Sequence, residues 1–184
     1  MKKLILALLF IGSLSINAQE NLPWQTDMKK AIAISKSENK PLFLFFTGSD
    51  WCGWCIRLQN EVFKTPEFIE WSKKVVLVDL DFPRSKPQDE AIKMQNQQLA
   101  QIFAVRGYPT VWFAKEVKGA DGNPILEQLG STGYVAGGPK AWIDIANPII
   151  AKFVPYPKMS KKEKRANKKL LQANKKLLTA KKAA

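Results

Sequence analysis

Two stretches of the chain are almost continuously apolar and rich in aromatic or β-branched residues. Pro41–Thr47 reads PLFLFFT, and Val75–Asp81 reads VVLVDLD. Runs of this length and composition are typical of strands buried on both faces, which belong to α/β sheets. Shorter apolar runs at Val111–Ala114 and Ile125–Leu129 flank the turn-forming segment Gly119–Asn123. We therefore predict two central strands and a later antiparallel hairpin.

Segments with apolar residues at helical spacing lie between and around these strands. They are Met28–Ser37, Cys52–Val62, Thr65–Trp71, Asp89–Phe103 and Lys140–Lys152. Strands that alternate with helices require crossover connections, whereas the final hairpin adds antiparallel strands. The pattern predicts an α/β fold with a mixed central sheet flanked by helices on both faces.

The first eighteen residues have the organisation of a secretory signal peptide. Lys2 and Lys3 precede the apolar run Leu4–Ile11, and small or polar residues follow as far as Ala18. The alternative, a membrane anchor, needs about 20 apolar residues, and this apolar segment is shorter. We expect cleavage after about Ala18 and an exported, periplasmic protein that meets oxidised thiols.

Charge is concentrated at the other end of the chain. The formal net charge is +13, but residues 19–157 hold 16 basic and 15 acidic side chains, whereas 11 basic residues and one acid follow from Lys158 onward. The tail repeats AN-KK-LL with a period of seven, which favours a helix. We expect a domain at 19–154 and a soluble Lys-rich tail at 155–184 that is either flexible or a fraying helix. The alternative is contact with an anionic surface, such as lipid head groups or cell-wall polymers, or with an acidic protein, and no nucleic-acid partner is expected after export.

Several kinds of metal and nucleophile chemistry are excluded by composition. The chain has no histidine and two cysteines, which removes His-based triads, His metal sites and four-thiolate zinc sites. Asp79 and Asp81 share one face at a strand end, but no further ligand cluster follows them. We interpret both as solvated acids, and we predict no metal site.

The two cysteines lie where a buried strand ends and a helix begins, in the sequence WCGWC. A helix N-terminus favours a thiolate through its unpaired N–H groups and the positive end of its dipole. Cys52, at this end, is expected to be the more exposed nucleophile, and Cys55, one turn later, the resolving thiol. A structural disulfide is the alternative, but a bridge across four residues restricts little unfolded-chain entropy. The pattern predicts a thiol–disulfide oxidoreductase whose only redox group is the Cys52–Cys55 pair, without a cofactor.

These motifs together resemble the thioredoxin superfamily. WCGWC after FLFFTGSD, then VVLVDLD, RGYPT and VWF, are similar to exported bacterial thioredoxin-like proteins and to the thioredoxin-like end domain of disulfide-interchange reductants. The similarity covers about Trp24–Lys152. It implies a thioredoxin fold, a cis peptide bond at Pro109 facing the two sulfurs, and a Tyr108 backbone that pairs with an extended substrate segment.

The resemblance also implies partners. Protein thiols and disulfides are the expected substrates, a donor in the envelope supplies electrons, and reduction is the expected direction. Trp51, Gly53 and Trp54 would border the substrate together with Tyr108 and Pro109, although simple packing explains the two tryptophans equally well. The rival function is a binding or scaffold module in which CGWC is vestigial.

One departure from the family concerns proton transfer. Thioredoxin carries a buried acid in the strand before its cysteines, whereas Phe43–Phe46 contains none. Proton transfer from Cys55 is therefore expected to pass through water, Asp50 or Glu61.

Overall fold

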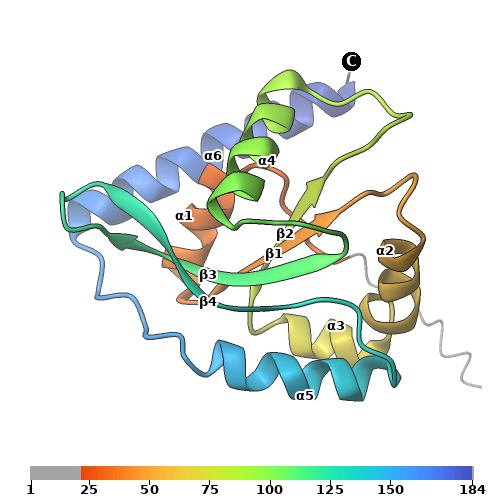
Figure 1. The fold of residues 1–184 in the computed structure, drawn as a ribbon. Helices are drawn as coiled ribbons and strands as arrows, with labels where there is room; N and C mark the ends of the chain where they lie inside the picture. The colour runs from red at the N-terminus through yellow and green to blue at the C-terminus, as the bar shows by residue number, and fades with distance from the viewer. Residues whose placement is uncertain (1–21, 184) are drawn as a thin grey trace, which may run out of the picture.

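A mixed four-stranded sheet forms the centre of the computed structural model, which describes residues 22–183 (Figure 1). The expected signal peptide lies outside these residues. The strands stand in the order β2-β1-β3-β4, with β1 parallel to β2 and antiparallel to β3, and with β3 antiparallel to β4. They are β1 (Leu42–Thr47), β2 (Val76–Asp81), β3 (Thr110–Lys118) and β4 (Pro124–Thr132). The mixed sheet expected from the sequence is confirmed.

Helices cover both faces of this sheet. One face carries α2 (Gly53–Leu58), its π-helical continuation η1 (Gln59–Phe63), α3 (Pro66–Ser72) and α5 (Gly138–Ile150). The other carries α1 (Met28–Glu38) and α4 (Glu90–Ile102). Because β1 is central, all six of its residues are buried, as its continuous apolar run predicts.

The side chains of β1 alternate between two different cores. Phe43 and Phe45 point into an aromatic core beneath α2, α3 and α5, where Phe63 and Phe68 stack with their ring centroids 4.5 Å apart. The α5 residue Trp142 is fully buried in this core. Leu42, Leu44 and Phe46 point into the second, largely aliphatic core beneath α1 and α4.

The hairpin is longer than its apolar residues predict. β3 continues to Lys118 and β4 begins at Pro124, so polar residues extend both strands around the expected turn. β4 is an edge strand with mostly exposed side chains, and its pattern therefore lacks the continuous hydrophobicity that marks the two central strands.

The Lys-rich tail is part of the fold rather than a flexible extension. Residues Lys161–Ala183 form helix α6, which lies against the outer side of α1 (Figure 1). The Asn167 Nδ2 group donates a hydrogen bond of 2.9 Å to the Ala33 carbonyl oxygen. Within residues 22–183, no helix combines the length and apolar content needed to cross a bilayer.

Candidate active site

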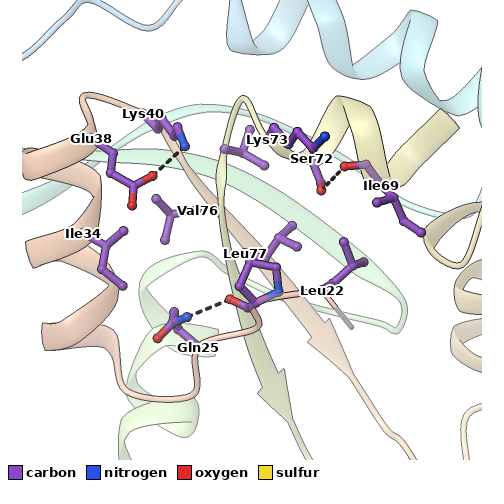
Figure 2. A pocket seen from close by; sticks show the side chains of 12 residues that line it. Leu22, Gln25, Ile34, Glu38, Lys40, Ile69, Ser72, Lys73, Val76 and Leu77 are labelled. Carbon is purple, nitrogen blue, oxygen red and sulfur yellow. Dashed lines mark hydrogen bonds and ion pairs between the residues drawn. The ribbon is translucent and has the colours of Figure 1, made fainter. Parts of the chain in front are cut away.

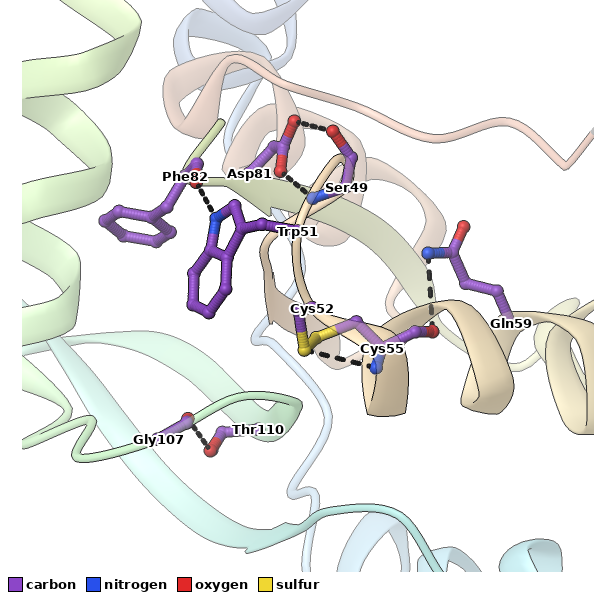
Figure 3. Close-up of a disulfide and its surroundings, with 9 residues drawn as sticks. All are labelled: Ser49, Trp51, Cys52, Cys55, Gln59, Asp81, Phe82, Gly107 and Thr110. Carbon is purple, nitrogen blue, oxygen red and sulfur yellow. Dashed lines mark hydrogen bonds between the residues drawn. A yellow bond between two sulfur atoms is a disulfide. The ribbon is translucent and has the colours of Figure 1, made fainter. Parts of the chain in front are cut away.

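The turn after β1 is held tightly in place. The Ser49 amide and hydroxyl donate hydrogen bonds of 2.7 and 2.6 Å to the two carboxylate oxygens of Asp81, at the end of β2. Gly48 allows the indole ring of Trp51 to lie against the backbone, because a Cβ atom there would stand 2.4 Å from the ring. The turn therefore delivers Cys52 to the start of α2 in a fixed position (Figure 3).

Cys52 and Cys55 form a disulfide, with their Cα atoms 5.2 Å apart. Cys52 is the N-cap residue of α2, and its Sγ accepts a hydrogen bond of 3.2 Å from the Cys55 amide. Cys52 keeps 6% of its surface exposed, whereas Cys55 is fully buried. The order of exposure agrees with the expectation, although the exposed area of Cys52 is small. The same amide hydrogen bond can stabilise a Cys52 thiolate once the disulfide is reduced.

A loop that precedes β3 faces the disulfide. Figure 3 shows Gly107 on this loop and Thr110 at the start of β3, opposite the sulfur atoms, and the Thr110 hydroxyl donates 2.8 Å to the Gly107 carbonyl oxygen. Between them, the Tyr108–Pro109 peptide bond is cis, as the resemblance implies.

One flank of the disulfide consists of the aromatic rings of Trp51 and Tyr108, with the guanidinium group of Arg84 over the Trp51 ring. The Trp51 ring lies 5.6 Å from the Tyr108 ring, and its Nε1 donates 2.8 Å to the Phe82 carbonyl oxygen. The Arg84 guanidinium lies 3.9 Å from the centre of the Trp51 ring, within the range of a cation–π contact. Burial raises the pKa of the Tyr108 hydroxyl, which keeps it neutral.

A second flank, at Trp54, has the same combination of groups. The Trp54 ring lies 5.0 Å from the Tyr134 ring, and the Arg57 guanidinium lies 5.3 and 5.2 Å from these two rings. Trp54 is 55% exposed, so its packing leaves most of the side chain open to a partner. Gly53 also borders open space, since a Cβ atom there would meet nothing within 4 Å.

The two carboxylates expected to move protons are engaged elsewhere. Asp50 accepts backbone hydrogen bonds from Ser85 and Arg84, which lower the pKa of its carboxyl group. Glu61 accepts hydrogen bonds of 2.6 Å from the Tyr134 hydroxyl and from Arg57, and these also lower its pKa. Both groups are poor proton acceptors at neutral pH, so neither suits the expected role.

The structure supplies a buried acid from the neighbouring strand instead. Asp79 stands beside Phe45 in the register of β1 and β2, and it follows Leu77 on the sheet face that carries the cysteines. Burial, with a smaller contribution from Asp81, raises the pKa of Asp79 to about 7. Its buried Oδ1 has no hydrogen-bond partner in the described residues. This raised pKa lets Asp79 change protonation near neutral pH.

The interpretation of Asp79 and Asp81 as solvated acids is wrong for both. Asp79 is largely buried, and Asp81 holds the Ser49 turn. Among the described residues, no three Cys, His, Asp or Glu side chains come together as a metal site. Sequence reasoning also missed Arg84 and Tyr134, because a loop cation and an isolated tyrosine carry no periodic signal before the fold brings them to the disulfide.

A pocket of about 470 Å³ lies at the other end of the sheet (Figure 2). It is lined by the start of β2, the ends of α1 and α3, and the segment that begins at Leu22. It contains neither cysteine, because the disulfide lies beyond the end of β1.

A sequence profile of the thioredoxin-like domain matches residues 28–137. The chain belongs to this family. The thioredoxin fold inferred from the resemblance is thereby confirmed. The chain is a thioredoxin-like thiol–disulfide oxidoreductase.

Curated relatives of this thioredoxin-like chain carry redox names. It is 35% identical to the disulfide bond reductase DsbH of Chlamydia pneumoniae over 127 residues, which make up 68% of the chain and 71% of DsbH. It is 34% identical to the thioredoxin-related protein DsbJ of the same organism over 115 residues, 59% of the chain but only 33% of DsbJ. The solved structure of a DsbH oxidoreductase matches with a TM-score of 0.64 and 31% identity, covering 77% of the chain and 93% of that structure.

Proposed function

We propose that this protein reduces disulfides in other proteins of the cell envelope. The observation that carries the proposal is the Cys52–Cys55 pair at the start of α2, facing the cis-Pro109 loop. The similarity to a protein named disulfide bond reductase supports the direction of electron flow. The signal-peptide pattern of residues 1–18 supports export.

The reaction follows from the exposure of the two sulfurs. In the reduced protein, the Cys52 thiolate attacks one sulfur of the substrate disulfide, which forms a mixed disulfide and releases the first substrate thiolate. Cys55 then loses its proton and attacks Cys52 Sγ. This second step restores the Cys52–Cys55 disulfide and releases the second substrate thiolate. Two electrons pass to the substrate, and its two thiolates take up protons.

Deprotonation of Cys55 needs an acceptor because this residue is fully buried. Asp79 suits the role better than Asp50 or Glu61, since its pKa of about 7 lets it hold or release a proton at neutral pH. A water molecule between the two groups would complete the path.

The substrate segment would lie between the two aromatic flanks. Trp51 and Trp54 border it on either side, and Gly53 leaves space above the start of α2. The backbone of Tyr108 and Pro109 would pair with the substrate in the manner of an added strand.

Insulin reduction in the presence of a dithiol tests the proposal. We expect turnover by the wild-type protein and none by Cys52→Ser. Cys55→Ser should accumulate a mixed disulfide, because nothing remains to resolve it. If the wild type shows no turnover with any thiol donor, the rival function as a binding module is favoured.

The reduction potential of the Cys52–Cys55 couple tests the direction separately. An equilibrium series in reduced and oxidised glutathione measures it. A potential near that of thioredoxin, about −270 mV, supports a reductase. A value near about −120 mV would make the protein an oxidant and contradict the proposed direction.

A further inference from the structure

Helix α6 is fixed to the domain at several points. The Tyr156 hydroxyl lies 3.0 Å from Ser35 Oγ and accepts 3.2 Å from the Glu116 amide, and the Tyr156 amide donates 2.7 Å to Asn39 Oδ1. These contacts hold the segment before α6 against the end of α1. Asn167 then joins the helix itself to Ala33. The charges on α6 therefore have a set orientation relative to the sheet.

Glu163, the acidic residue of this segment, caps the start of α6. Ser160 and Glu163 form a capping box, in which the Ser160 amide donates 2.7 Å to Glu163 Oε2 and the Glu163 amide donates 3.2 Å to Ser160 Oγ. These bonds lower the pKa of Glu163 and keep it at the helix end. Residues 164–183 contain no Asp or Glu, so the rest of α6 contributes no negative side chain to offset its cations.

Three cations in the first turns of α6 form a row on the side that faces away from α1. Asn167 and Leu171 are half-buried, whereas Lys162, Arg165 and Lys169 are exposed. At 3.6 residues per turn, the three cations stand on the side opposite Asn167 and Leu171. Lys161 and Lys168, also exposed, lie on the flank of this row, whereas the exposed Lys164 stands seven residues before Leu171 and therefore on the side of α6 that faces α1.

The composition of this row fits a diffuse anionic surface better than a shaped protein site. Nearly all its cations are lysines, which act as flexible point charges and lack the planar fork with which arginine recognises one carboxylate. Like charges also stand four residues apart, as at Lys161 and Arg165 or at Lys164 and Lys168, which weakens an isolated helix. An anionic bilayer would relieve this repulsion along the whole helix.

We propose that the outer face of α6 binds the protein to anionic phospholipid membranes. The helix would lie flat on the headgroups by charge alone, because its half-buried side is occupied by α1. Cys52 and Cys55 belong to the core on the opposite face of the sheet from α1, and Figure 1 shows α6 on the outer side of α1, so a protein held in this way keeps the disulfide open to its partners. This proposal does not depend on the redox function.

Vesicle co-sedimentation tests the proposal, with the chain from residue 19 onward so that the apolar N-terminal segment does not itself bind lipid. Vesicles of phosphatidylglycerol and phosphatidylcholine are compared with vesicles of phosphatidylcholine alone. We expect binding to the anionic vesicles, weakened by salt, and none to the neutral ones. A variant with Lys162, Arg165, Lys168 and Lys169 replaced by Gln should bind about 100- to 1,000-fold more weakly, since each cation near an anionic bilayer contributes about fivefold.

A matched variant separates the α6 row from net charge. Replacing the exposed residues Lys64, Lys74, Lys118 and Lys140 by Gln removes the same charge elsewhere and should weaken binding by less than about tenfold. Circular dichroism and insulin reduction show that both variants remain folded. Equal binding by the two variants, or equal binding to neutral vesicles, would overturn the proposal. Capture on heparin without binding to vesicles would assign the row to soluble polyanions instead.

Discussion

The two faces of the sheet differ in what they pack and in what they present to solvent. The α2, α3 and α5 face has an aromatic core and carries the disulfide, whose neighbours Trp51 and Trp54 each pack against a tyrosine. The α1 and α4 face has a mainly aliphatic core and carries the cationic helix α6 on its outside. The chemistry therefore lies on one side of the molecule and the excess charge on the other. The net positive charge of the chain thus comes mainly from the segment that forms α6 and not from the residues around the active site.

Truncation of the aromatic core should have the largest effect on stability. Trp142 is fully buried, and its Nε1 donates 3.0 Å to the Gly133 carbonyl oxygen. Trp142→Ala should lower the free energy of unfolding by about 3–5 kcal/mol, through the lost apolar contacts and the cavity left behind. Urea unfolding of the oxidised protein measures this. A loss below about 1 kcal/mol would mean that this face does not carry the main core.

The buried acid should make stability depend on pH. The pKa of Asp79 is raised from 3.8 to about 7 in the folded protein, so the folded state binds the proton more tightly than the unfolded state. Protonated Asp79 therefore stabilises the folded protein at acid pH. This contribution to the free energy of unfolding, as much as about 4 kcal/mol, is lost as the pH rises from 3.8 to about 7. Asp79→Asn should remove the dependence. Urea unfolding of both proteins at pH 5 and pH 8 tests this, and parallel curves would contradict it.

Loss of a hydrogen bond in the turn before Cys52 should lower stability by a moderate amount. Ser49→Ala removes one of the two hydrogen bonds to Asp81 and leaves a partly buried carboxylate oxygen without that donor. We expect a loss of about 1–2 kcal/mol in unfolding free energy and slower insulin reduction. Unchanged kinetics with the expected loss of stability would show that the turn supports the fold without positioning Cys52.

The contact between α6 and α1 should have the smallest effect. Asn167→Ala removes the bond to Ala33 and should lower stability by about 1 kcal/mol or less. Amide hydrogen exchange should rise in α6 and stay unchanged around the disulfide. Faster exchange at the disulfide as well would show that the two faces are not independent.

The sequence predicts the central strands and most helices well because the apolar residues of each element mark the faces that become buried. β1 is apolar throughout since neighbours cover it on both sides, and the helix at Pro66 begins after Thr65, whose side chain accepts from the Phe68 amide as its N-cap position predicts. The hairpin is underestimated because β4 lies at the edge and keeps polar residues.

The candidate site is predicted only where local sequence determines it. The position of Cys52 at the start of a helix follows from neighbouring residues, and the cis bond at Pro109 follows from the resemblance. The burial of Asp79 does not follow from local sequence, because it depends on the elements that pack over the edge strand β2. The packing of α6 on α1 also cannot be predicted from local sequence, because α1 lies more than a hundred residues earlier in the chain.

The central claim is that the start of α2 keeps reduced Cys52 ionised at a pH where ordinary thiols are protonated. Alkylation of the reduced protein with iodoacetamide at pH 5.5, followed by peptide mass spectrometry, measures this directly. Cys52 should react about tenfold faster than a cysteine in an unstructured peptide, and faster than Cys55. A Cys52 rate equal to or below that of the peptide would contradict the account.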